Sequence, residues 1–72
     1  METKNERFKR LAEKRTKNVL NTIRVLSNLS NKGLYDYTPE QVQKIFGAIH
    51  NSLKRAEGRF KGEHVKGIEF KL

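Results

Sequence analysis

Basic side chains recur along the first third of the chain at a spacing that suits the binding of a polyanion. Arg10, Lys17 and Arg24 follow one another every seven residues, so on a helix they lie nearly in line. Three further polar residues run beside them on the same face, namely Lys14, Asn21 and Asn28. We call Arg10, Lys14, Lys17 and Arg24 the basic ridge. This pattern is typical either of a solvated helix face or of a surface that neutralises phosphates.

On DNA, Lys side chains would neutralise phosphates, while amide and guanidinium groups would reach base edges. The residues that could read bases are Asn21, Arg24, Asn28 and Asn31. A second basic cluster of candidate phosphate contacts consists of Lys54, Arg55 and Arg59, with Lys61 close by in the sequence.

Sixteen Lys and Arg against eight Asp and Glu give a net charge of +8. That charge favours DNA, RNA, anionic lipid or an acidic protein, and it does not choose among them.

The residues that catalysis or metal binding would need are missing or scattered. The chain has no cysteine, and its two histidines, His50 and His64, have no ligand-like spacing around them. The sequence shows no glycine-rich phosphate loop, no pair of carboxylates at a catalytic spacing and no Ser, His and Asp signature. We therefore expect a protein that is not an enzyme and that holds no metal or cofactor.

Two amphipathic helices are predicted to position the basic residues. The first runs from about 4 to 29, because Thr3 and Glu6 have the spacing of a capping box. The second runs from about 39 to 60, opened by Thr38-Pro39-Glu40-Gln41 and closed near Gly58 and Gly62. Apolar residues at steps of three and four predict a buried stripe on each helix. The stripes comprise Phe8, Leu11, Ala12, Val19, Ile23 and Leu26 in the first helix and Val42, Ile45, Phe46, Ile49, Leu53, Ala56 and Phe60 in the second.

The last residues change period, and alternation of Ile68, Phe70 and Leu72 with Glu69 and Lys71 predicts a short β-strand over about 65–72. It could pair with Val65 and its neighbours, with the segment from Leu34 to Tyr37, or with the same strand of a second subunit. The alternative is an extension that becomes ordered only in a complex. The predicted fold is mainly α. A single domain over residues 1–72 would form an antiparallel helical hairpin with a C-terminal strand, completed by a homodimer.

Five segments carry a resemblance when taken together: Arg7–Thr16 with its Leu-Ala-Glu-Lys-Arg-Thr run, Ile23–Leu26, Asn28–Asn31, Tyr35–Thr38 and Val42–Phe46. As a set they resemble a mostly uncharacterised family of small bacterial helical proteins, some of them associated with plasmids or other mobile elements. The resemblance covers roughly residues 7 to 60. It implies a bacterial cytoplasmic origin and a short helical module, and it assigns no site residues.

These observations lead us to expect a small accessory or regulatory protein that binds DNA, more readily than RNA, through the basic ridge. The alternative is a homodimeric interaction module that binds an acidic protein. Attachment to an anionic membrane is less favoured, because Trp is absent and the apolar stripes suit packing. No apolar run has the length of a membrane span or a signal peptide, so a cytoplasmic location is expected.

Overall fold

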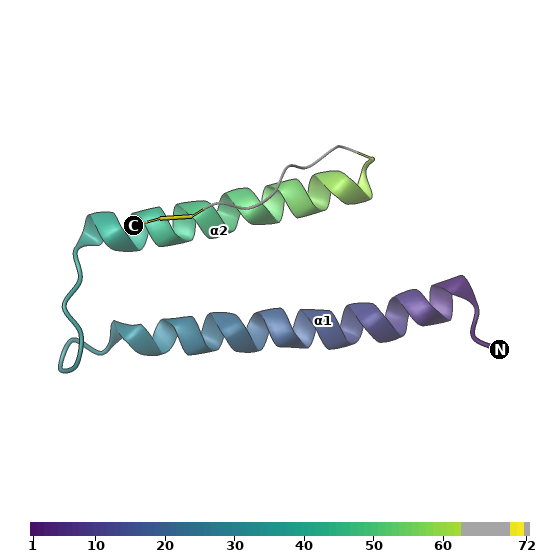
Figure 1. Ribbon diagram of the computed structural model, residues 1–72, viewed down its shortest axis with the longest axis horizontal. Helices are drawn as coiled ribbons and strands as arrows, with labels where there is room; N and C mark the ends of the chain where they lie inside the picture. Colours follow the sequence, from purple (N-terminus) through teal and green to yellow (C-terminus); the bar gives the residue numbers. More distant parts are fainter. Residues whose placement is uncertain (63–69, 72) are drawn as a thin grey trace. The chain divides into compact units, whose positions relative to one another are not determined.

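The computed structural model describes residues 1–62, 70 and 71, and in this part of the chain the protein is mainly helical. It contains α1 (Lys4–Ser27), a single 3₁₀ turn η1 (Asn28–Ser30) and α2 (Pro39–Phe60), as Figure 1 shows. The chain divides into two compact units. The unit Met1–Tyr35 holds α1 and η1, and the unit Asp36–Leu72 holds α2.

The predicted capping box at the start of α1 is confirmed. The Thr3 hydroxyl accepts a hydrogen bond from the Glu6 backbone N–H at 3.0 Å. In return, the Thr3 backbone N–H donates to Glu6 Oε1 at 3.3 Å. Two of the N–H groups that no helical carbonyl can reach are thereby satisfied. This reciprocal pair fixes the first residue of α1 at Lys4.

The end of α1 differs slightly from the prediction of residue 29. The α-helix ends at Ser27 and tightens into η1, where the Asn28 N–H donates to carbonyls of both Val25 and Leu26. A turn centred on Asn31 follows. Its carbonyl accepts from the backbone N–H groups of Leu34 and Tyr35, and its side-chain Oδ1 accepts from the Gly33 N–H at 2.9 Å. Asn and Asp favour such turns because their side chains mimic a backbone carbonyl.

α2 begins and ends where the sequence signals place it. Thr38 caps the helix, with its hydroxyl accepting from the Gln41 N–H at 3.1 Å and the Gln41 side chain accepting from the Thr38 N–H at 2.9 Å. Pro39 occupies the first turn, where its missing N–H costs nothing. At the other end Gly62 adopts a φ of 90°, and its N–H donates to the Arg59 carbonyl. Glycine enters this left-handed conformation without strain, which suits it to a helix end.

The apolar residues share one face of each helix, as predicted, but the structure does not bury them. Among the described residues no hydrophobic side chain is buried. Ile45 and Ile49 are half-buried, whereas Phe46 is 43% and Phe60 80% exposed. The apolar residues predicted for the second helix therefore form a stripe, but in the described part of the chain they do not form a buried cluster.

The predicted strand over 65–72 falls mostly outside the described residues. Within that range the structure describes Phe70 and Lys71, and neither belongs to a strand. Phe70 is 44% exposed. The strand, like the antiparallel pairing of the helices and the dimer, stays a prediction.

Replacing Thr38 by Ala is expected to destabilise the protein by about 1 kcal/mol, because the Gln41 N–H loses its acceptor. Urea unfolding followed by circular dichroism at 222 nm measures this loss. Thr38→Ser keeps a hydroxyl acceptor and serves as the control, with an expected change of a few tenths of a kcal/mol. An equal loss of unfolding free energy in the Ala and Ser variants would show that the hydroxyl of residue 38 does not stabilise the helix.

Replacing Gly47 by Ala is expected to stabilise α2 by about 1 kcal/mol, since Ala has the higher helix propensity. An added Cβ at Gly47 meets no atom within 4 Å. Gly62→Ala is the matched control, because a side chain at its φ of 90° is strained and should destabilise by about 1–2 kcal/mol. Both changes are read from the unfolding midpoint in urea. Destabilisation by Gly47→Ala would mean that another backbone lies against this position.

Candidate nucleic-acid interface

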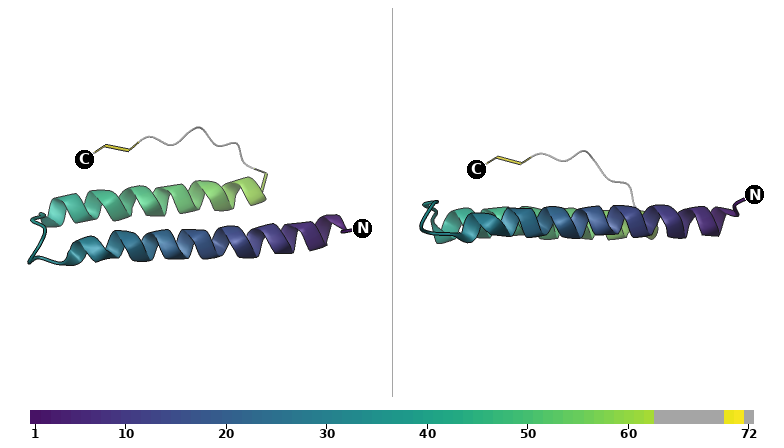
Figure 2. Two further views of the ribbon diagram at one scale, coloured as in Figure 1. Left: turned by 60° about the horizontal axis from the view of Figure 1, so that its bottom comes forward. Right: turned by 90° about the horizontal axis from the view of Figure 1, so that it is seen from below.

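The basic ridge lies on one face of a single unbroken helix. Arg10, Lys14, Lys17 and Arg24 all belong to α1 and are all exposed. At about 1.5 Å of rise per residue, each step of seven residues advances about 10.5 Å along the axis. At about 100° per residue the ridge lies opposite the stripe that contains Phe8, Val19 and Leu26. Figure 2 shows α1 running without a break through these positions. These four residues therefore share a helix as expected, and their role in binding stays a prediction.

Net positive charge is more concentrated in α1 than in the chain as a whole. This helix carries eight of the sixteen Lys and Arg but two of the eight Asp and Glu. One of these acids, Glu6, is engaged in the capping box. The positive potential along α1 is therefore weakly compensated by acids of the same helix, and such a field attracts polyanions at long range.

Arg10 is the ridge residue that already has an anionic partner. Its Nε donates to Glu2 Oε2 at 2.9 Å and its Nη2 donates to Glu2 Oε1 at 3.2 Å, a bidentate pair. The hydrogen bond with Glu2 raises the pKa of the Arg10 guanidinium above its ordinary value, against a smaller lowering by burial. Sequence spacing does not indicate this contact. Two positions eight residues apart on a helix are separated by about 12 Å along its axis, and Glu2 precedes the helix, so no helical pair pattern applies.

The candidate base-reading residues divide into two groups. Asn21 and Arg24 lie together on α1, where Arg24 Nη2 donates to Asn21 Oδ1 at 3.0 Å. Because this contact uses the Asn21 amide oxygen, it does not use the two donors of the Asn21 NH₂ group. Asn28 lies in η1, beyond the end of α1. The side-chain oxygen of Asn31 is used by the turn, where it accepts from Gly33, so Asn31 is not part of the α1 face.

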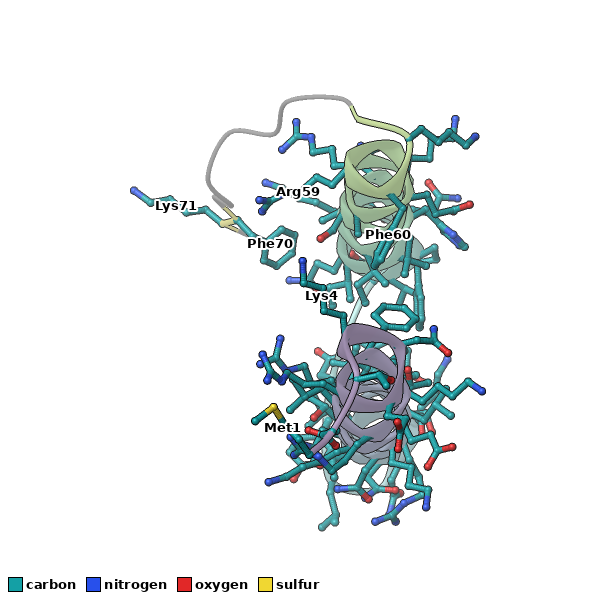
Figure 3. All side chains as sticks on the ribbon, turned by 90° about the vertical axis from the view of Figure 1, so that its right-hand side faces the viewer. Met1, Lys4, Arg59, Phe60, Phe70 and Lys71 are labelled. Carbon is teal, nitrogen blue, oxygen red and sulfur yellow. The ribbon has the colours of Figure 1, made fainter. Side chains whose placement is uncertain are left out.

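The second basic cluster does not form one face of α2. Arg55 and Arg59 are four residues apart and lie one turn above one another on the helix. Lys54 precedes Arg59 by five residues, which turns it about 140° away around the axis. Figure 3 shows how neighbouring positions diverge, with Arg59 and Phe60 leaving α2 in different directions. The cluster predicted as a unit is therefore a pair, Arg55 and Arg59, with Lys54 on another side.

Within residues 1–62, 70 and 71, no three His, Cys, Asp or Glu side chains gather closely enough to hold a metal ion. Over the same residues, neither helix has the length and apolar character needed to cross a bilayer. His50 is exposed on α2, and His64 lies outside the described residues.

No match to this chain is found among family models, curated proteins or solved structures. The resemblance to small bacterial helical proteins therefore stays a prediction that rests on the segments from Arg7 to Phe46. The 24-residue helix α1 carries the cations of the basic ridge nearly in line. Such a line can contact successive phosphates of an extended polyanion.

Proposed function

We propose that this protein is a small accessory or regulatory protein of the bacterial cytoplasm that binds DNA through the basic ridge of α1. Lys14, Lys17 and Arg24 would contact phosphates. Arg10 would also contact a phosphate once its ion pair with Glu2 is broken. Arg55 and Arg59 on α2 would form a second contact, and Lys54 would act separately. The observation that supports this proposal most is the concentration of eight basic residues on one exposed helix.

DNA is favoured over RNA because Arg10, Lys17 and Arg24 lie nearly in line on α1 at a constant spacing of seven residues. An unbroken helix presents its side chains to a long regular groove or backbone, whereas specific RNA binding mostly uses unstacked loops and aromatic platforms. Asn21, held by Arg24, places an amide among the phosphate-binding cations, where it could contact a base edge.

The proposal includes an antiparallel pairing of the two helices and a homodimer. Apolar residues of α2 alternate at steps of four and three, the spacing of a coiled-coil seam. We call these residues the α2 seam: Val42, Phe46, Ile49, Leu53, Ala56 and Phe60. Because no hydrophobic side chain is buried in the described part of the chain, a second copy would supply the missing cover.

The alternative is a homodimeric interaction module whose partner is an acidic protein. The exposed apolar side chains support it, since such surfaces commonly mark protein contacts. The same basic ridge would then meet carboxylates in place of phosphates. The two proposals differ in the ligand of the ridge and agree on the dimer.

Replacing Arg10, Lys17 and Arg24 together by Gln should weaken binding to a duplex by about a hundredfold or more near 0.1 M salt. Each lost phosphate contact also lowers the slope of log affinity against log salt by about 0.9. Fluorescence anisotropy with labelled duplex DNA across a salt series measures both quantities. Gln retains high helix propensity, so circular dichroism should show α1 intact.

The matched control replaces Lys4, Lys9 and Lys44 by Gln, which removes the same charge away from the ridge. This variant should lose much less affinity than the ridge variant. Equal losses would show that net charge alone drives binding. If the unchanged protein does not bind duplex at low salt, the DNA proposal fails and an acidic protein partner becomes the better hypothesis.

Replacing Leu53 by Glu should convert a dimer to a monomer, because a carboxylate in the α2 seam would be desolvated against apolar side chains. Sedimentation equilibrium reads the mass, which for one chain is 8.4 kDa. Asn51→Glu, on another side of α2, is the control and should leave the mass unchanged. The unchanged protein offers a second readout, since the thermal midpoint of a dimer rises with protein concentration. A concentration-independent midpoint and a mass of one chain would refute the dimer.

A further inference from the structure

A second arginine faces the carboxylate that Arg10 holds. The Arg7 Nε lies 3.8 Å from Glu2 Oε1, the oxygen that also accepts from Arg10 Nη2. The three side chains stay accessible, with exposed fractions of 33% for Glu2, 61% for Arg7 and 59% for Arg10. Two guanidinium groups, one turn apart on α1, therefore converge on one anion at a site open to solvent. Met1 and Lys4, which are labelled in Figure 3, mark this end of α1.

The position of Glu2 is set by the cap of the helix. Thr3, the next residue, has extended backbone angles of φ −73° and ψ 166° and is held on both sides by the capping box. The Arg7 N–H also donates to the Thr3 carbonyl at 3.0 Å. The chain therefore leaves the helix in one direction, which places Glu2 where its side chain can turn back to Arg10. A carboxylate near a helix N-terminus is also favoured by the helix dipole.

We propose that Arg7 and Arg10 form a phosphate-binding fork and that Glu2 occupies it in the free protein as an internal competitor. The guanidinium group matches carboxylate and phosphate in the same bidentate way, so the carboxylate stands where a phosphate oxygen pair would bind. An ion pair this exposed is weak, so a polyanion that gains contacts along the whole ridge can displace it. The identity of the ligand as a nucleic-acid phosphate rests on the proposed function.

The fork adds Arg7, which the sequence analysis left out of the candidate site, to the residues that contact phosphate. It also makes Glu2 a regulator of affinity. Removing its charge frees both arginines without altering any residue of the ridge. The expected gain is about two- to fivefold in affinity, the size that an exposed ion pair permits.

The test compares Glu2→Gln with Glu13→Gln, which changes the net charge by the same amount at a residue within α1. Binding of labelled duplex is measured by anisotropy, and each change is repeated in an Arg10→Gln background. Glu2→Gln should tighten binding more than Glu13→Gln, and the difference should shrink in the Arg10→Gln background, where Glu2 faces Arg7 alone. In parallel, NMR follows the Arg7 and Arg10 Nε–H resonances of the protein during titration with inorganic phosphate. These resonances should shift at lower phosphate in Glu2→Gln than in the unchanged protein or Glu13→Gln.

The outcomes separate this inference from the proposed function. Arginine resonances that respond more readily to phosphate in Glu2→Gln, with no variant binding duplex, would support the fork and refute DNA binding. Tight, salt-dependent duplex binding with identical effects of Glu2→Gln and Glu13→Gln would support DNA binding and refute the fork. Arg7 and Arg10 resonances that phosphate leaves unchanged in Glu2→Gln would also overturn the fork.

Discussion

Uncovered apolar surface is the constraint on which the rest of this structure depends. Helices of 24 and 22 residues gain one hydrogen bond per added residue, but in proteins most helical stability comes from the packing of an apolar face. Two reciprocal capping boxes satisfy N–H groups at their starts, at Thr3 and Thr38. Caps are worth about 1 kcal/mol each, whereas covering one large apolar side chain is worth about 1.5–3 kcal/mol. Burial must therefore supply most of the stability, and the described residues bury no hydrophobic side chain.

That comparison favours association as the source of stability. Phe46, Leu53 and Phe60 recur every seven residues along α2 and are all exposed. Seven-residue spacing keeps a seam facing one partner along its whole length, which scattered surface apolar residues do not do. A second copy that covers this seam would supply burial without changing the opposite faces of the helices.

The sequence predicted the features that depend on neighbouring residues. Thr-x-x-Glu and Thr-Pro-x-Gln determine local hydrogen bonds, so the starts of both helices agree with the structure. The faces of α1 follow from helical periodicity, which likewise needs no tertiary information. The pairing of Glu2 with Arg10 depends on how the chain enters the helix, and no periodic pattern encodes it. Burial depends on what covers a face, so the position of Phe46 on the apolar stripe follows from periodicity, whereas its exposed fraction of 43% does not follow from neighbouring residues.

The charge pattern of α1 links stability to binding. Like charges at spacings of three and four, such as Arg10 with Lys14 and Lys14 with Lys17, destabilise a helix by about 0.2–0.5 kcal/mol per pair. Glu2 offsets part of this repulsion at the free end of the ridge, where it pairs with Arg10. A bound polyanion would neutralise the remaining cations, and any ligand that binds only the folded helix stabilises it in proportion to occupancy. Repulsion along the ridge therefore weakens the free helix, and if a polyanion binds as proposed, relief of this repulsion would make α1 more stable in the complex than in the free protein.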